Sequence, residues 1–237
     1  MSTLTLLLAG PLQSWGAAAR FSRRTTEPAP TKSAVIGLLA SAQGIQRGDD
    51  EQLRPLSALR FGVRIDQPGT RLRDFQTAIH WETGKSMPLS ERFYLADAVF
   101  VAAVEGAPGL LADLHAALRT PAYPPFLGRR SCPPARPLEL GLHLDKNLLQ
   151  ALRHEPWQAS RWHTKRHTDR PDVKLPVLYE TNGDTTDTDT LRDQPVSFAT
   201  EHRRHALRGI ARTTIDIPIA ATPLRHDPFD ALSEESR

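Results

Sequence analysis

Apolar and polar positions recur along this chain in patterns that predict both strands and helices. The short apolar run at residues 4–9, closed by Gly-Pro, is typical of a buried strand. After a polar stretch, Thr31 can cap a helix whose apolar residues recur at helical spacing until about Gly44. Residues 61–65 then alternate apolar and polar side chains, which predicts a half-buried strand.

The middle of the chain repeats this order after an interruption. Residues 68–92 contain few large aliphatic side chains and are expected to form a protruding excursion, as a long hairpin. Residues 94–104 are almost continuously apolar, as expected of a central strand. A second helix is predicted from Pro108, and residues 138–144 alternate again as a fourth strand.

This order of elements predicts an α+β class of fold. Strand, helix, strand, excursion, strand, helix, strand is the ferredoxin-like, split βαβ arrangement of RRM-type RNA-recognition domains. We expect both helices on one face of an antiparallel sheet, with the other face free. Beyond residue 145, the pattern predicts a short helix at 146–153 and strands at 173–179 and 208–217, separated by an acidic loop.

The expected organisation therefore has three parts. They are a ferredoxin-like domain over residues 1–144 with an inserted β-hairpin at about 68–93, a smaller β-rich C-terminal region over 145–219, and a mobile tail over 220–237.

Composition and charge describe a globular protein with a weak preference for nucleic acid. Of its 237 residues, 39% are apolar, which suffices for a real core. The single cysteine cannot form an internal disulfide, and the opening "MSTLTLLLAGPLQSWG" fits neither a signal peptide nor a membrane span. We therefore expect a cytoplasmic protein with no membrane partner. The net charge is only +3, but the basic residues are mostly arginine, which binds phosphates and stacks on bases.

Two early segments offer candidate RNA contacts, each with a structural alternative. In the loop at residues 10–16, Trp15 can stack on a base while Gln13 bonds a base edge, or Trp15 can instead plug the core. Lys32 and Ser33 open the first helix, where free N–H groups favour a phosphate. The alternative there is a capped helix with a solvated lysine.

The excursion and two basic runs mix cations with aromatic rings. The excursion carries Arg71, Arg73, Lys85 and Arg92, interleaved with His80, Trp81 and Phe93. This mixture fits backbone contacts plus base stacking, although a solvated surface loop is the alternative. The runs at residues 161–167 and 202–212 suit either an RNA backbone or an acidic partner surface, with a solvated charged face as their alternative.

The stretch "PFLGRRSCPP" at residues 125–134 places Arg129 and Arg130 between prolines. The prolines restrict the loop, which lowers the entropic cost of ordering two guanidinium groups on binding. Gly128 permits a turn or a close backbone approach. Adjacent side chains on an extended segment point apart, so we expect one arginine to reach RNA and the other to brace the fold or a neighbouring subunit. Cys132 is expected to be a structural thiol.

Catalysis and metal binding have little support in the sequence. No histidine pair has the HExxH spacing and the acidic loop lacks a calcium pattern, so we expect neither metal nor cofactor. Metal-independent RNA cleavage would need a base, an acid and a cation, for which His80, Tyr94 and Lys85 supply suitable side chains without a diagnostic spacing. This metal-independent endoribonuclease remains the alternative function.

Five separated motifs resemble one known family in the same order. They are "LAGPLQSWG", "PTKSAVIGLLASAQGIQRGDD", "LRDFQT", "ERFYLADAVFVAAV" and "YPPFLGRRSCPPARPL", which resemble the CasD subunits of type I-E CRISPR Cascade complexes, members of the RAMP superfamily. The resemblance covers roughly residues 4–144. It implies a ribonucleoprotein subunit of antiviral defence that binds and caps the 5′ handle of the crRNA. The large subunit and a backbone subunit would be its protein partners, and target DNA would be met only through the complex.

The resemblance also assigns roles to the segments above. The excursion resembles a thumb hairpin that wedges between nucleotides near the junction of handle and spacer. A related branch in type I-C systems cuts precursor crRNA, but the type I-E branch leaves this step to a separate subunit, so we expect no catalytic residues. The candidate RNA-binding residues are Gln13, Trp15, Arg20, Lys32, Ser33, Arg73, His80, Arg92, Arg129 and Arg130.

Overall fold

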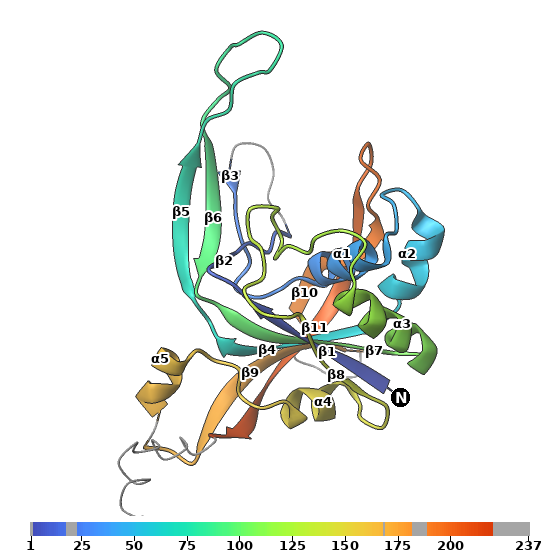
Figure 1. The fold of residues 1–237 in the computed structure, drawn as a ribbon, viewed down its shortest axis with the longest axis vertical. Coiled ribbons are helices and arrows are strands. Elements are labelled where there is room, and N and C mark those ends of the chain that lie inside the picture. Colours follow the sequence, from blue (N-terminus) through green and yellow to red (C-terminus); the bar gives the residue numbers. More distant parts are fainter. Residues whose placement is uncertain (1, 18–22, 168, 182–188, 220–237) are drawn as a thin grey trace, which may run out of the picture.

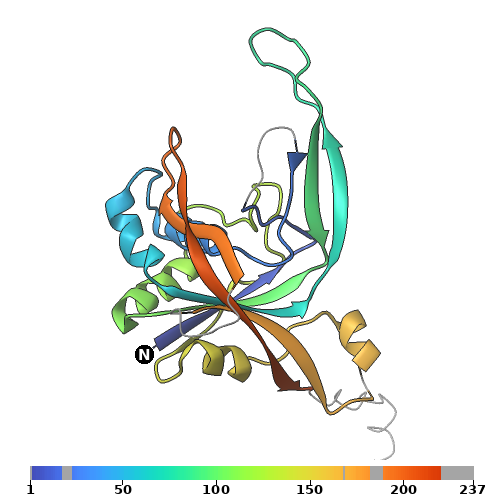
Figure 2. The same ribbon diagram turned by 180° about the vertical axis from the view of Figure 1, so that it is seen from behind.

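The computed structural model describes residues 2–17, 23–167, 169–181 and 189–219 (Figures 1 and 2). Candidate residue Arg20 and the tail predicted to be mobile lie outside these ranges. The elements up to the hairpin are β1 Ser2–Ala9, β2 Leu12–Gln13, β3 Arg23–Arg24, α1 Lys32–Gln43, α2 Asp50–Ser57, β4 Arg60–Gln67 and β5 Thr70–Gln76. Those that follow are β6 Ser90–Ala96, β7 Val99–Gly106, α3 Pro108–Arg119, β8 Glu139–His143, α4 Leu148–His154, α5 Arg161–Thr164, the 3₁₀ turn η1 Lys165–His167, β9 Asp172–Glu180, β10 Asp189–Ser197 and β11 Arg204–Pro218.

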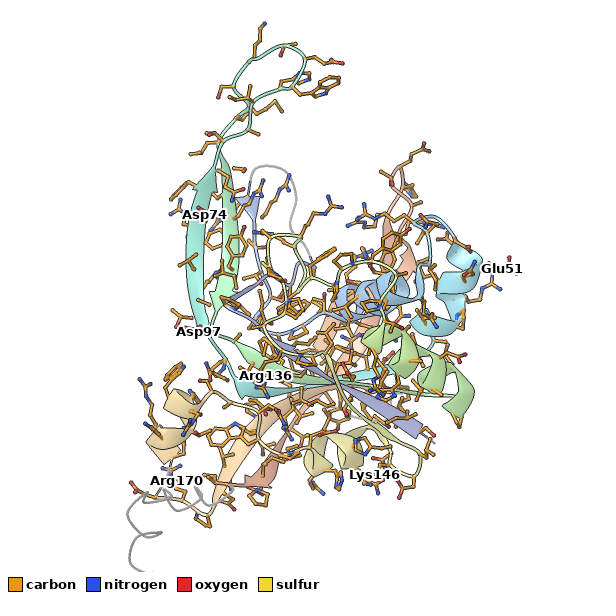
Figure 3. All side chains as sticks on the ribbon, in the orientation of Figure 1. Glu51, Asp74, Asp97, Arg136, Lys146 and Arg170 are labelled. Atoms are coloured by element: carbon orange, nitrogen blue, oxygen red, sulfur yellow. The ribbon has the colours of Figure 1, made fainter. Side chains whose placement is uncertain are left out.

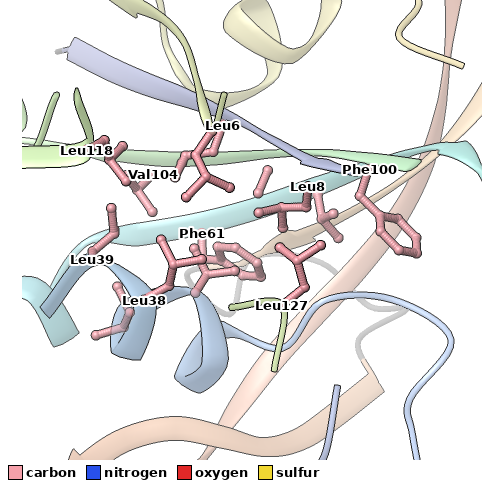
Figure 4. Packing of buried hydrophobic residues seen from close by; sticks show 14 of the residues in the cluster. Leu6, Leu8, Leu38, Leu39, Phe61, Phe100, Val104, Leu118 and Leu127 are labelled. Carbon is pink, nitrogen blue, oxygen red and sulfur yellow. The ribbon is translucent and has the colours of Figure 1, made fainter. Parts of the chain in front are cut away.

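One antiparallel sheet organises the molecule, and the predicted α+β class is confirmed. Its strands follow the order β10-β11-β9-β4-β7-β1-β8, with β1 paired to β7 along its whole length. Helices α1 and α3 pack together on one face of this sheet. Leu6, Leu8 and Phe100 from the strands meet Leu38 and Leu39 from α1 in the main core (Figure 4).

The opposite face of the sheet is covered, contrary to the expectation that it is free. Helix α4 packs across β1, β4 and β7, and its Leu148 and Leu152 join Val101 and Ala103 in a second core. The backbone of Gly62 lies so close that an added Cβ would meet the side chain of Leu148 at 2.8 Å. Among the described residues, the sheet surface over β1, β4 and β7 is therefore closed to an RNA strand on this side.

This second core also changes the character of β4, which was predicted to be half-buried. Arg64 and Asp66 are both fully buried and form a bidentate pair, with Nε–Oδ1 at 2.6 Å and Nη2–Oδ2 at 2.8 Å. Arg64 also donates to the carbonyls of Leu152 and Glu155 at the end of α4. Burial raises the pKa of Asp66, and the hydrogen bonds and charge of Arg64 oppose that rise.

A long hairpin stands out from one end of the sheet, at the position of the predicted excursion (Figure 1). Its strands β5 and β6 pair in register from Thr70–Ala96 to Gln76–Ser90, and we call residues 70–96 the thumb. The single apolar strand predicted at residues 94–104 is wrong. Asp97 adopts a positive φ of 56°, which separates β6 in the thumb from β7 in the main sheet.

The C-terminal strands continue the main sheet, because β9 pairs with β4 at Gly62–Tyr179 and the two adjoining positions. Strand β10 begins within the predicted acidic loop, so part of that loop is a strand. Helix α2 was not predicted, although Asp49 caps it by accepting from Gln52 N at 3.0 Å. No helix in the described part of the chain is both long and apolar enough to span a membrane.

Candidate nucleic-acid interface

A cationic groove of about 1310 Å³ lies between the hairpin of β10 and β11 and the segment that precedes α1. Parts of residues 14–17, 24–27, 33–34, 128–129 and 191–206 line it, and we call it the arginine groove. In Figures 1 and 2, the thumb and the β10–β11 hairpin project from the same side of the main sheet, with the loop at residues 120–135 between them. The fold thus brings distant basic segments to one side.

The charge of the arginine groove is strongly unbalanced. Among its described lining residues, the only carboxylate is Glu27, whereas the cations are Arg24, Arg129, Arg192, Arg203 and Arg204. Arg204 approaches Asp50 at 3.7 Å, but their side chains are 54% and 41% exposed, so this pair is weak. Arginines in a concave surface without matching carboxylates are typical of a site for phosphate groups.

The loop containing the adjacent arginines is fixed against the first strands by Gly128. This glycine has a φ of 85°, and an added Cβ would lie 1.7 Å from the carbonyl oxygen of Ser14. Ser14 N donates to Leu127 O at 3.1 Å, and Leu127 N donates to Cys132 O at 2.7 Å. Both the turn and the close approach allowed by glycine are therefore present, and they hold the loop in place.

The single cysteine is part of this fixed loop. Cys132 is buried, its backbone N donates to Arg129 O at 2.8 Å, and burial raises the pKa of its thiol. A raised pKa suppresses the reactive thiolate at neutral pH. This environment agrees with the predicted structural role of Cys132.

Arg129 and Arg130 line different hollows, as expected of neighbours that point apart. Arg129 lines the arginine groove, stacks over Tyr94 at 4.7 Å and donates from Nη2 to the carbonyl of Arg24 at 2.8 Å. Arg130 lines an adjoining pocket of about 900 Å³ together with Tyr123 and Phe126. The two hollows share Phe198 and Arg203, so they form one continuous surface beside α1.

Gln13 and Trp15 lie in the core and not on a binding surface. Both side chains are fully buried. Trp15 Nε1 donates to Gln13 Oε1 at 3.1 Å, and Gln13 Nε2 donates to the carbonyls of Leu8 and Ala98 at 3.1 and 2.7 Å. The hydrogen bonds of both polar groups are thus satisfied internally, in agreement with the alternative that Trp15 plugs the core.

At the start of α1, a side chain of the protein takes the place that a phosphate would need. The backbone N of Lys32 donates to Asp193 Oδ2 at 2.7 Å, which fills the position considered for a phosphate. The Lys32 side chain is buried and its Nζ lies 2.9 Å from Glu180 Oε2. Burial lowers the pKa of this amine, while the charge and hydrogen bond of Glu180 oppose that shift. Of the candidate pair, Ser33 alone lines the arginine groove.

The remaining candidates lie along the thumb. Arg73 stacks over Phe75 at 4.5 Å and pairs with Glu91 at 2.5 Å, both on the exposed hairpin. Arg92 on β6 lies opposite Arg24 on β3 in the parallel pairing of these two strands. This pairing joins the thumb to the edge of the groove. His80 lies near the tip, where its Nδ1 accepts from Thr83 N at 3.4 Å. Figure 3 shows Asp97 at the base of the thumb and Asp74 farther along it. Between Asp74 and the tip, side chains project away from the hairpin.

Four arginines of the groove do not belong to the candidate residues predicted from sequence: Arg24, Arg192, Arg203 and Arg204. The basic run at 202–212 did mark the segment of Arg203 and Arg204. Nothing in the sequence indicated that this run would fold back beside "PFLGRR", because that depends on β10 and β11 joining the sheet.

Comparisons with known proteins agree with this geometry. A family model described as CRISPR-associated protein (Cas_Cas5) matches residues 3–210. The CRISPR system Cascade subunit CasD of Escherichia coli (strain K12) is 39% identical over 158 residues, which cover 59% of this chain and 70% of that protein.

Two solved structures share the fold over almost the whole chain. A chain from a structure titled "CRISPR RNA-guided surveillance complex" has a TM-score of 0.74 and 32% identity, covering 94% of this chain and 95% of its own. A chain from "Crystal structure of Cas protein" has a TM-score of 0.72 and 33% identity, covering 93% and 100%. The chain therefore belongs to the CRISPR-associated Cas5 family, as a CasD-like subunit of a type I-E Cascade surveillance complex.

Proposed function

We propose that this chain is a non-catalytic RNA-binding subunit that holds and caps the 5′ handle of the crRNA and joins the large subunit of Cascade to the backbone. The arginine groove is the observation that carries this proposal. It presents five arginines and a single carboxylate among its described lining residues. A surface of this kind attracts the phosphates of a single strand, and loops around it can contact splayed bases.

Unsatisfied hydrogen-bond donors beside the groove support the same function. In the described part of the chain, Arg92 Nε and Arg129 Nη1 are buried nitrogens without an acceptor. A buried donor without a partner carries a free-energy penalty that a bound oxygen would remove. Both nitrogens belong to residues expected from sequence to contact RNA. A shift of either side chain on binding would bring its donor to a phosphate or ribose oxygen.

We assign the ferredoxin-like RAMP arrangement to the four strands β8-β1-β7-β4 with α1 and α3 on one face. The thumb is then the insertion that wedges between nucleotides. Its exposed large apolar side chains are Leu72, Phe75, Ile79, Trp81, Met87 and Leu89. Exposed apolar surface of this extent is typical of an interaction site, and a backbone subunit beside the RNA would cover it.

The thumb geometry also supports a non-catalytic role. Tyr94 pairs with Leu72 in the hairpin, whereas His80 lies eight residues farther toward the tip. At about 3.3 Å per extended residue, this separation is on the order of 25 Å, too far for one acid–base pair. The three side chains considered for metal-independent cleavage are thus not assembled within one chain.

We expect the protein to act in the cytoplasm and to meet target DNA only through the complex.

The test is retention of crRNA by the assembled complex when Arg203 and Arg204 are both replaced by alanine. Losing two phosphate contacts on a single strand should weaken retention and lower the salt slope by about 1.4. A matched control removes two exposed arginines outside the groove, Arg54 and Arg153. Unchanged retention in the groove variant would contradict the proposal.

A second experiment tests the alternative function, by incubating the purified chain with repeat hairpin RNA and a chelator. A discrete product that is lost in His80→Ala would establish the endoribonuclease.

A further inference from the structure

A second cationic and aromatic surface lies on the face of the sheet opposite the arginine groove. It is formed by residues 157–167, which include α5 and η1, and we call it the α5 platform. Trp162 is 48% exposed and carries the guanidinium of Arg166 over its ring at 4.9 Å. The ring of His163 meets Trp162 edge-on at 5.5 Å. The indole is therefore held by its neighbours while much of it stays open to solvent.

The platform is attached firmly to the end of β4. Trp157 Nε1 donates to Asp66 O at 3.0 Å, and Ser160 donates from both N and Oγ to Gln67 Oε1. Trp157 also packs against the core beneath α4. Because Asp66 and Gln67 end the strand that leads into the thumb, the platform lies at the thumb's root, on the opposite side of the sheet (Figures 1 and 3).

The charge around Trp162 is positive. Arg161, Arg166 and Arg170 are exposed, and within the described ranges none of the three forms an ion pair. The nearby Asp169 is the exposed carboxylate of this segment. A flat indole flanked by guanidinium groups offers stacking to a base and ion pairs to its phosphates, which is how single strands are held without sequence preference.

The surroundings favour a nucleic acid over a protein partner. Among the described residues between 145 and 180, Trp162 is the only exposed large apolar side chain. A protein docking surface surrounds its central aromatic with further apolar contacts that exclude water. Here the neighbours of the indole are charged or polar, so a solvated phosphate backbone is the better complement.

We propose that the α5 platform is a second binding surface for single-stranded RNA, with one base stacked on Trp162 and adjacent phosphates paired with Arg161 and Arg166. This inference rests on the proposed function for its choice of RNA, the nucleic acid that such a complex carries. A strand leaving the arginine groove around the root of the thumb would meet this surface next. The platform thus extends the RNA path to the other face of the protein.

The experiment measures binding of a fluorescein-labelled oligouridine of about ten nucleotides to the full chain by fluorescence anisotropy. It uses two backgrounds, the natural chain and the groove variant Arg192→Ala, Arg203→Ala, Arg204→Ala. In both, Trp162→Ala should weaken binding by about tenfold and Trp162→Phe should restore most of it, because stacking tolerates any aromatic ring. Arg166→Ala should lower the salt slope by about 0.7. Arg153→Ala, an exposed arginine on α4, is the control and should have no effect.

The outcomes separate this inference from the function of the groove. If the groove variant loses all binding and Trp162→Ala changes nothing, the platform proposal is wrong while the groove function stands. If the groove variant binds RNA normally and Trp162→Ala does not, the groove function fails and the platform remains. Binding of single-stranded DNA without RNA would overturn the proposal. So would loss of a protein subunit from the assembled Trp162→Ala complex with RNA binding unchanged.

Discussion

Two sets of basic side chains in this protein are built in opposite ways. Lys32, Arg64 and Arg208 are buried, and each pairs with a carboxylate, from Glu180, Asp66 and Asp193 respectively. The arginines of the groove are mostly exposed and line a surface with one carboxylate among its described residues. Buried cations need partners because desolvation is costly, whereas a cation kept for a ligand is best left partly solvated and unpaired.

The buried, paired cations hold the fold, and the exposed arginines of the groove are available for a ligand. Asp193 connects the start of α1 to β11. It accepts a hydrogen bond from Lys32 N and binds Arg208 through two hydrogen bonds of 2.9 and 2.8 Å. This buried network fixes β10 and β11 against the start of α1. The arrangement of the arginine groove therefore depends on the backbone of Lys32 and on the buried side chain of Arg208.

The largest effect is expected from Lys32→Met. This change leaves Glu180 without its buried partner, so the free energy of unfolding should fall by roughly 3–5 kcal/mol in urea denaturation. The RNA affinity of the folded fraction should stay unchanged, because Lys32 is 1% exposed. Combining Lys32→Met with Glu180→Met should recover part of the lost stability. A variant that folds normally but releases RNA would show that Lys32 binds phosphate after all.

A smaller but still large effect is expected from Gly128→Ala. The new methyl group would meet the backbone of Ser14 at a positive φ, so we expect a loss of more than about 2 kcal/mol, together with weaker RNA binding. Gly109→Ala is the matched control, since nothing lies within 4 Å of its added Cβ. Normal stability and RNA affinity in Gly128→Ala would mean that the arginine loop does not need its fixed position.

The smallest effect concerns pH and His205, which lines the arginine groove. Burial, aided by the charge of Arg203, lowers the pKa of His205 below its usual 6.5, so the free protein holds it neutral at pH 7.5. Phosphates in the groove would raise that pKa, so binding takes up a proton and affinity should increase as pH falls below about 6.5.

The expected gain is at most about fivefold, the size of an exposed ion pair. His205→Gln should remove this gain when RNA binding is titrated at pH 7.5 and pH 6. An equal gain in the variant would assign the proton uptake to another group.

The sequence predicts the periodic elements of this fold well and misses what tertiary packing decides. Residues 61–65 do form a strand, but the polar side chains expected to be solvated are buried, because α4 covers that face. The run at 94–104 reads as one strand because the residues on both sides of the break are buried and apolar. The charged and exposed Asp97 is the local sign of the break.

The candidate site was predicted in part for a similar reason. Arg129 and Ser33 do line the arginine groove, but Lys32, Gln13 and Trp15 are buried with internal partners. A polar residue beside a glycine-rich turn looks the same in sequence whether it faces solvent or the core. The carboxylates that bind the backbone and the side chain of Lys32 are more than 140 residues away in the sequence. No local pattern reveals such a pairing.

We propose that the crRNA lies in the arginine groove between the thumb and the β10–β11 hairpin. Photocrosslinking of the assembled complex, with 4-thiouridine in the handle and mass spectrometry of the linked peptides, tests it most directly. We expect crosslinks in residues 23–27, 128–130 and 191–206. Crosslinks confined to other surfaces of the chain, or no crosslinks to this subunit at all, would contradict it.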